Sequence, residues 1–134
     1  MPHTFRRTSC GDYEKSSRMS EIARFEQNRR RSRAVVHGGV VYLAGHVADD
    51  KTASIDEQTR QALANIDRTL ATAGTDKSRL LTAQILLRTM DDYEGMNAVW
   101  DAWVEPGQTP TRCCGEVRLA DPKLRVEIVV TAAL

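Results

Sequence analysis

Apolar residues along the chain fall into short runs that predict β-strands. These runs lie at residues 22–25, 34–37, 40–44, 80–87, 112–119 and 126–132, and they are rich in β-branched or alternating side chains. Gly38-Gly39 separates the second run from the third, and glycine supplies the positive φ that a tight turn needs. The sequence therefore predicts a β-hairpin around this glycine pair.

A helical period follows the hairpin. Ser54 and Glu57 match a capping box, in which a hydroxyl and a carboxylate each satisfy a backbone N–H group at a helix start. Apolar residues then recur at spacings of three, four and three, at Leu63, Ile66, Leu70 and Ala73. Gly74 comes next and favours a helix end. The pattern predicts a helix over residues 55–73.

A second helix is predicted between the strands at 80–87 and 112–119. Asp91 and Glu94 can start it, and it ends before Pro106. Its expected buried side carries Tyr93, Met96, Trp100 and Trp103. Because each helix connects one strand to the next, both are expected on one face of a mixed sheet, which gives a two-layer α+β domain.

The other face of this sheet also needs a cover. The strands at 80–87 and 126–132 are apolar in both directions, as in strands that are buried on both faces. In a chain of 134 residues, the simplest cover is another copy of the same chain. We therefore expect an oligomer whose sheets close into a shared, barrel-like core.

Composition and length fit one ordinary globular domain. The 134 residues are 41% hydrophobic and 28% charged, which is typical of a folded soluble chain. Residues 1–18 show no periodicity and are predicted to form a flexible tail, which leaves residues 19–134 as a single domain. No apolar run has the length of a membrane span or the character of a signal peptide, so we expect a cytoplasmic protein.

The charge pattern and the cysteines bear on nucleic-acid binding, disulfide formation and metal binding. The formal net charge is +1, and the basic residues Arg29-Arg30-Arg31-Ser32-Arg33 lack interleaved aromatic residues, so the composition does not call for a nucleic-acid partner. Cys113 and Cys114 are adjacent, and adjacent strand residues point to opposite faces, which disfavours a disulfide between them. With Cys10 as the third cysteine and no CxxC pair, we expect reduced thiols and no metal site.

Arg112 is the first candidate site residue. It follows a loop that contains Gly107 and Pro110, and a guanidinium at the mouth of a strand can hold a small carboxylate through two parallel hydrogen bonds. The alternative is an exposed arginine on an edge strand. Alternation places Cys114 on the same strand face, either as a buried, unreactive thiol or as part of the lining of a small pocket.

Two further residues are candidates. Glu127 interrupts the apolar strand at 126–132, where a buried carboxylate costs several kcal/mol unless it is paired. It either faces water, forms a structural ion pair, or acts as an acid–base group. Asn97 lies on the second predicted helix, either facing solvent or orienting the loop before Arg112.

An ordered series of short motifs resembles the reactive intermediate deaminase family, also called RidA-like or YjgF-like and labelled endoribonuclease L-PSP. The resemblance covers roughly residues 20–134. Its motifs are Val41-Tyr42-Leu43-Ala44-Gly45, Gln58-Thr59-Arg60-Gln61 through Ile66, Ala73-Gly74-Thr75-Asp76, Met96-Asn97-Ala98-Val99-Trp100, Pro110-Thr111-Arg112 and Val126-Glu127-Ile128.

This resemblance implies a chorismate mutase-like fold and a homotrimer with its sites in the clefts between subunits. It implies that Arg112 binds the carboxylate of an imine or enamine derived from an amino acid, and that Glu127 handles the attacking water. The products would be a 2-oxo acid and ammonia, with no metal or organic cofactor. A trimer that binds small carboxylates without turnover is the alternative function, and a ribonuclease is a third.

The chain departs from the family pattern around this expected site. Arg31 stands where active members have a tyrosine, and Ala44 stands where they have a serine. Gly45 is kept, and His46 replaces the usual glutamine. The resemblance therefore makes Arg31, Ala44 and Gly45 substrate-binding candidates. The basic run Arg29–Arg33 motivates the further hypothesis that Arg31 adds a second positive charge to the cleft and selects a more anionic ligand.

Overall fold

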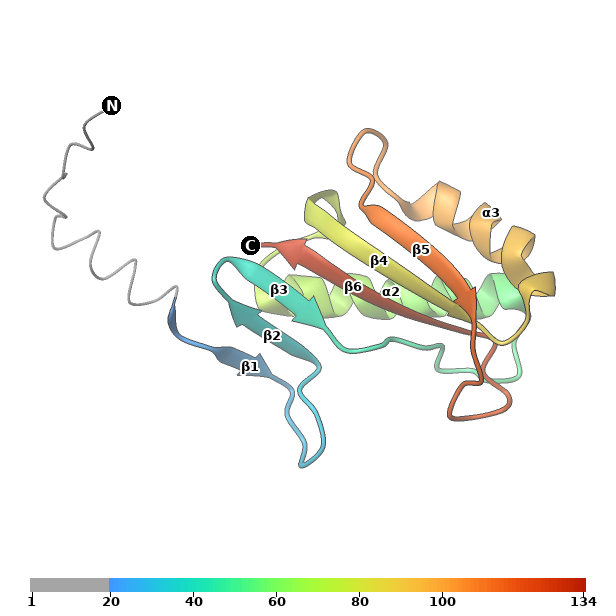
Figure 1. Cartoon of the computed structure of the whole chain (residues 1–134), viewed down its shortest axis with the longest axis horizontal. Coiled ribbons are helices and arrows are strands. Elements are labelled where there is room, and N and C mark those ends of the chain that lie inside the picture. The colour runs from blue at the N-terminus through green and yellow to red at the C-terminus, as the bar shows by residue number, and fades with distance from the viewer. Residues whose placement is uncertain (1–19) are drawn as a thin grey trace, which may run out of the picture.

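Within residues 20–134, a mixed six-stranded sheet and two α-helices make up the fold (Figure 1). The computed structural model describes residues 20–134, so the tail predicted at residues 1–18 lies outside the described residues. The strands are β1 Ala23–Phe25, β2 Ala34–His37, β3 Val40–Leu43, β4 Leu80–Leu87, β5 Thr111–Glu116 and β6 Val126–Ala133. The helices are α2 Ile55–Ala73 and α3 Tyr93–Trp103, with short 3₁₀ turns η1 at Lys77–Arg79 and η2 at Met90–Asp92.

The strand order in space is β1-β2-β3-β6-β4-β5. Only the pair β4–β5 is parallel, because α3 crosses over between these two strands; the other neighbours are antiparallel. The predicted mixed α+β sheet is therefore confirmed. The short strand β1 and the strand β5 form its two edges.

The predicted hairpin joins β2 to β3. His37 pairs with Val40, and Gly38 and Gly39 between them have φ values of +59° and +79°. Two successive residues in the left-handed region are characteristic of a turn that follows the twist of its flanking strands. The glycine pair thus sets the register of this hairpin.

The ends of α2 lie where the sequence predicts them. Ser54 caps the start, its Oγ accepting a hydrogen bond of 3.3 Å from the N–H group of Glu57. The Glu57 carboxylate does not complete the reciprocal bond of a capping box and instead accepts from Arg60 and Gln61. Gly74 ends the helix at φ +92°, a left-handed conformation that costs glycine little.

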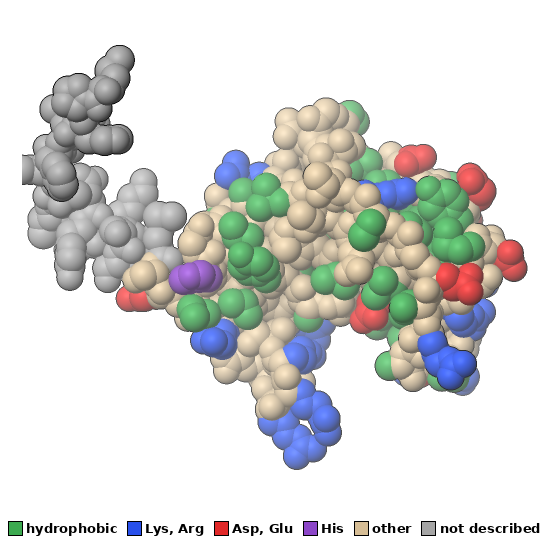
Figure 2. All heavy atoms as spheres, viewed as in Figure 1, with side chains coloured by type: hydrophobic (Ala, Val, Ile, Leu, Met, Phe, Trp, Pro, Cys, Tyr) green, Lys and Arg blue, Asp and Glu red, His purple; other side chains and the backbone are tan. Residues whose placement is uncertain are grey.

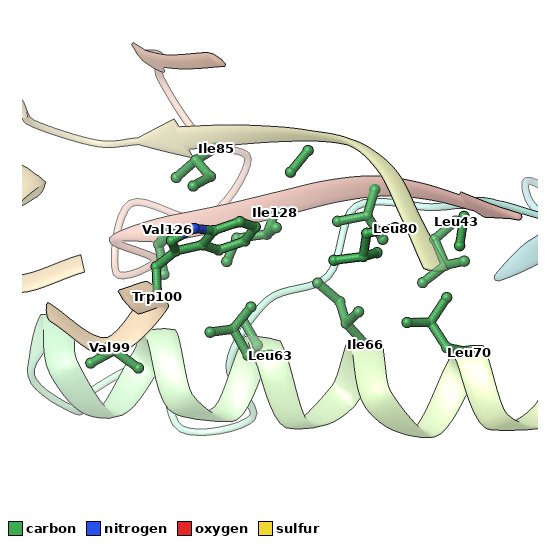
Figure 3. Close-up of a cluster of buried hydrophobic side chains, with 14 of the residues drawn as sticks. Leu43, Leu63, Ile66, Leu70, Leu80, Ile85, Val99, Trp100, Val126 and Ile128 are labelled. Carbon is green, nitrogen blue, oxygen red and sulfur yellow. The ribbon is translucent and has the colours of Figure 1, made fainter. Parts of the chain in front are cut away.

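The core lies between the sheet and the two helices (Figure 3). Its main members are fully buried aliphatic side chains of α2, β4 and β6: Leu63, Ile66, Leu70, Ile85, Leu87, Val126, Ile128 and Val130. Along β6, buried residues alternate with half-buried ones. We call the covered side of the sheet the helix face and the other side the open face.

No segment of residues 20–134 covers the open face. Tyr42 on β3 is 47% exposed, and its β6 partner Thr131 is half-buried. On β4, the residues between the core positions include the exposed Thr82 and Gln84 and the half-buried Leu86. The sequence predicts that these strands are apolar on both faces. The structure instead shows one buried face and one mixed face, because β4 and β6 each carry polar residues toward the open side.

Strand β5 ends earlier than the alternating pattern predicts. The pattern continues to Leu119, whereas the strand stops at Glu116. Its one sheet neighbour, β4, ends at Leu87, whose carbonyl accepts the N–H group of Val117. An edge strand cannot continue past the end of its partner, so the chain leaves the sheet there.

A buried polar network fixes the start of β6. Gln58 is fully buried, and its side chain accepts from the N–H group of Arg125 and lies within hydrogen-bond distance of the carbonyls of Lys51, Ala53 and Lys123. Arg125 in turn donates two hydrogen bonds, of 3.0 and 2.5 Å, to the buried carboxylate of Asp92 at the start of α3. This network ties both helices to the chain two residues before Glu127.

Candidate active site

Arg112 extends over the helix face of β5. Its parallel neighbour is Ala83, a core residue, and paired residues of a sheet point to the same side. Nη1 of Arg112 donates a hydrogen bond of 2.8 Å to Oδ1 of Asn97, and the guanidinium lies 5.6 Å from the centre of the Trp100 ring. These two contacts fix the direction of the guanidinium, which makes no other hydrogen bond to residues 20–134.

Helix α3 supplies both partners of Arg112. Asn97 and Trp100 are three residues apart, so they share one side of the helix. Trp100 is buried, and a cation over its indole face is attracted by the ring quadrupole. The sequence leaves Asn97 either facing solvent or orienting the loop before Arg112; in the structure, Asn97 contacts the Arg112 side chain itself.

Cys114 lies two residues along β5, on the same face as Arg112. It pairs with the core residue Ile85 and is half-buried, whereas the adjacent Cys113 is exposed. Burial raises the pKa of the Cys114 thiol, while the positive charge of Arg112 acts in the opposite direction. The thiol is therefore neutral at physiological pH, which fits a lining residue better than a nucleophile.

Glu127 lies on the open face. It pairs with Leu86 and stands between Val126 and Ile128, which are both buried against the helices. Among residues 20–134, no ion pair includes Glu127. Within the protomer, the structure therefore offers no support for a structural ion pair and leaves a half-buried carboxylate on the open face.

Gly45 is in direct contact with the Glu127 side chain. A Cβ atom added at Gly45 would lie within 2.8 Å of Glu127 Cδ and closer still to Oε1. This approach is available only to a residue without a side chain. Gly45 follows β3, and the neighbouring residue His46 forms an isolated β-bridge with Ile128, which keeps the two segments together.

Replacing Gly45 with alanine is expected to displace the Glu127 carboxylate. The clash falls on the end of a flexible side chain, so we expect a loss of about 1 kcal/mol or less in the free energy of unfolding. If Glu127 handles water, as proposed below, turnover should fall at least tenfold. Urea unfolding and steady-state kinetics of Gly45→Ala check this, with Gly115→Ala as control because a Cβ there meets nothing within 4 Å. Unchanged turnover would contradict a role for this contact.

Arg31 lies far from Arg112 within one protomer. It belongs to the loop between β1 and β2, where its Nη1 donates to the carbonyl of Glu26 at 2.9 Å. The side chain of Asn28 accepts from the N–H groups of Arg30 and Arg31 and orders the loop tip. This loop projects from the sheet beside the edge opposite β5, and basic side chains gather on it (Figures 1 and 2).

The candidate residues thus form two separate groups. The arginine half-site consists of Arg112, Asn97, Trp100 and Cys114 on the helix face of β5. The glutamate half-site consists of Glu127, Gly45 and the adjoining Ala44. A side chain cannot reach through a hydrogen-bonded sheet, so a small ligand held by Arg112 does not meet Glu127 of the same protomer. The cavity of about 610 Å³ beside the end of β5 includes neither residue.

Within residues 20–134, no group of three or more His, Cys, Asp or Glu side chains is arranged to hold a metal ion. No helix in the same range has the length and apolar character needed to cross a membrane.

Two residues of the site region were not identified as site residues from the sequence. The sequence pattern places Trp100 only on the buried side of its helix. Its spacing of three residues from Asn97 nevertheless indicates that the two side chains share one side of the helix. His46 was noted only as a departure from a family pattern. The structure shows that it is buried and that both ring nitrogens have partners. No local sequence pattern around His46 indicates its contact with Thr69 on α2.

Comparisons with known proteins agree on one family. The family model described as Endoribonuclease L-PSP matches residues 21–134. A RutC family protein of Haemophilus ducreyi is 44% identical over 113 residues, covering 84% of this chain and 97% of the relative. The RutC family protein YoaB of Escherichia coli is 40% identical over 113 residues, covering 84% and 98%.

Solved structures agree with this assignment. A member of the YjgF protein family from Neisseria meningitidis superposes with a TM-score of 0.83 at 48% sequence identity, covering 86% of this chain and 96% of that one. The mixed sheet with its two helices is therefore shared over most of the chain. The chain belongs to the RidA/YjgF family, whose family model carries the description endoribonuclease L-PSP.

Proposed function

We propose that this protein is a cytoplasmic, hydrolytic deaminase of reactive enamines and imines derived from amino acids, of the 2-aminoacrylate or 2-iminobutanoate type. The observation that carries the proposal is the preset guanidinium of Arg112, held between Asn97 and Trp100 with Nε and Nη2 free of partners among residues 20–134. Such a group binds a small carboxylate through charge-assisted hydrogen bonds.

The proposed reaction requires few catalytic groups. The carbon of a protonated imine is already electrophilic, so a positioned water can add to it once Glu127 accepts a proton from that water. The resulting carbinolamine carries a hydroxyl and an amine on one carbon. Glu127 returns the proton to the amine, the C–N bond breaks and ammonia leaves, and the hydroxyl passes its proton to Glu127 as it becomes the carbonyl of the 2-oxo acid. An enamine first takes a proton on carbon to become the imine. No metal or organic cofactor takes part.

The active unit in this proposal is a homotrimer. The arginine half-site of one copy faces the glutamate half-site of the next, and the open faces of the three sheets form a common interior. The placement of Arg112 and Glu127 on opposite faces of the sheet supports a composite site, because the reaction needs both groups at one substrate. The uncovered open face with the exposed Tyr42 supports burial against another copy.

The direct test measures ammonia and 2-oxo acid release from freshly generated 2-iminobutanoate and 2-aminoacrylate, above the rate of spontaneous hydrolysis. We expect acceleration by the wild-type protein and none by Arg112→Ala. Absence of acceleration by the wild type on either substrate would contradict the deaminase.

A binding trimer without turnover is the second candidate. Arg31, Ala44 and His46 replace hydrogen-bonding groups of active relatives, and loss of such groups can abolish turnover of a particular substrate. Trp100 lies beside Arg112, so its fluorescence should report binding of 2-oxobutanoate. Binding without any ammonia release would favour this module, whereas RNA cleavage that depends on Arg112 or Glu127 would favour a ribonuclease.

Arg31 is proposed to select anionic substrates when its loop reaches the arginine half-site of a neighbouring copy. Arg31→Ala is then expected to weaken binding of a 2-oxo dicarboxylate by about tenfold, the effect of one lost charge-assisted hydrogen bond, and to change binding of a monocarboxylate much less. Titrations of both ligands check this, with Arg30→Ala on the same loop as control. Equal effects on the two ligands would count against selection by Arg31.

A further inference from the structure

His46 is the most buried titratable side chain near the glutamate half-site, with 1% of its surface exposed. Its Nδ1 lies 2.6 Å from the carbonyl oxygen of Ala44, and its Nε2 lies 2.8 Å from Oγ1 of Thr69 on α2. The ring thus links the segment after β3 to the middle of the long helix. Both polar atoms of the ring are satisfied without water.

The hydrogen bonds identify the tautomer. A carbonyl oxygen can only accept, so the contact with Ala44 requires a proton on Nδ1. In the neutral ring, Nε2 then accepts from the Thr69 hydroxyl. Oγ1 of Thr69 also lies 3.1 Å from the carbonyl of Asn65, but its single proton cannot serve both acceptors. In the neutral Nδ1–H tautomer, the Thr69 hydroxyl donates its hydrogen bond to Nε2 of His46. A protonated ring carries a proton on Nε2, so the hydroxyl would then donate to the Asn65 carbonyl.

The backbone of His46 connects this ring to Glu127. Its N–H group donates to the carbonyl of Ile128 at 2.9 Å, and its carbonyl accepts from the N–H group of Ile128 at 3.0 Å. Gly45, which contacts the Glu127 carboxylate, lies between the Ala44 carbonyl held by the ring and this backbone bridge. The N–H group of Ala44 donates to the carbonyl of Arg33 at 2.9 Å, and the other hydrogen bonds that shape the turn 44–46 involve His46.

We infer that His46 is a positioning residue of the glutamate half-site: through its Nδ1–H group it fixes the Ala44–Gly45 turn against the Glu127 carboxylate. The inference rests on the proposed function for its catalytic consequence, since Glu127 is the water-handling group there. Its structural part, the tautomer and the turn, stands independently of any activity.

The surroundings of the ring keep it neutral. Burial lowers the pKa of His46 below its ordinary 6.5, the Ala44 carbonyl acts in the opposite direction, and Arg33 and Arg31 lower it further while Glu26 raises it. The polar pocket beside Thr69 is lined by Arg33 and Arg68 and also by Glu26 and Asp49, so its formal charges balance and burial remains the main cause of the lowered pKa. An unfolded histidine gains a proton below 6.5 and the buried one does not, so acidification through this range lowers the free energy of unfolding.

The structural test uses the imidazole ¹⁵N chemical shifts of the wild-type protein at pH 7.5. We expect a protonated Nδ1 and an unprotonated Nε2, and a shifted Gly45 amide in both His46→Leu and His46→Gln relative to wild type, larger in the leucine variant. An Nε2–H tautomer, or a Gly45 amide unmoved in His46→Leu, overturns the inference. These readouts do not depend on turnover, so they remain decisive if the proposed deaminase fails.

The kinetic test compares the same two variants. Leucine keeps the bulk of the ring without its polar atoms, so His46→Leu is expected to lower kcat about tenfold while KM changes less than about twofold, because the carboxylate anchor is on other elements. His46→Gln keeps a donor and should retain more of kcat. Because His46→Gln has no buried imidazole, its free energy of unfolding should also lack the decrease below pH 6.5 that the buried ring causes in the wild type. An equal rise of KM in both variants, or an unchanged acid dependence in His46→Gln, contradicts a positioning role.

Discussion

Replacement of Arg112 with alanine is expected to lower kcat/KM for 2-iminobutanoate by about three orders of magnitude. The guanidinium is the one cationic group of the arginine half-site, and its direction is preset by Asn97 and Trp100. Without it, the substrate carboxylate has no charged partner on the protomer that supplies the arginine half-site. Steady-state kinetics and Trp100 fluorescence titrations with 2-oxobutanoate measure the loss in turnover and in binding separately.

Two companion variants make the Arg112 result specific. Arg112→Lys keeps the charge but loses the planar fork, so an intermediate activity is expected. Arg118→Ala removes an exposed arginine just beyond β5 and should leave kcat/KM nearly unchanged. A loss below tenfold in Arg112→Ala, with the thermal unfolding midpoint maintained, would show that the carboxylate is bound elsewhere.

Replacement of Glu127 with glutamine is expected to lower kcat by about 10²- to 10³-fold while leaving KM within a small factor of the wild type. Glutamine has nearly the same shape, so the contact with Gly45 is retained, but an amide cannot accept and return the proton of the attacking water. Single-turnover measurements of ammonia release separate this chemical step from product release.

The matched control for Glu127 is Glu105→Gln, which removes one negative charge from an exposed position after α3. It should change neither kcat nor KM. If Glu127→Gln raised KM and spared kcat, Glu127 would be a binding group and the acid–base role would be wrong.

Local sequence patterns accounted for most of the elements because their signals are local. The glycine pair at 38–39 needs φ values that few other residues adopt, and Gly74 ends α2 for the same reason. The alternation in β6 also identified Glu127 as an interruption of a buried strand. Such signals depend on a few neighbouring residues and are therefore readable without the fold.

The sequence did not predict how the arginine half-site and the glutamate half-site lie relative to each other. Alternation shows that Arg112 and Cys114 share a face, but it does not show whether this is the face that Glu127 occupies. That depends on the strand order β6-β4-β5 and on the registers that pair Arg112 with Ala83 and Glu127 with Leu86. The end of β5 likewise depends on where β4 ends. The buried position of His46 depends on packing against Thr69, which is 23 residues away.

The central claim is that Arg112 of one copy and Glu127 of another act on the same substrate, and mixing two inactive variants tests it most directly. In the proposed trimer, a site is intact only where an intact Arg112 meets an intact Glu127 from a different copy. Random one-to-one trimers of Arg112→Ala and Glu127→Gln are therefore expected to recover about a quarter of the wild-type activity. If the mixed protein forms mixed oligomers and stays as inactive as the two separate variants, the composite site is contradicted.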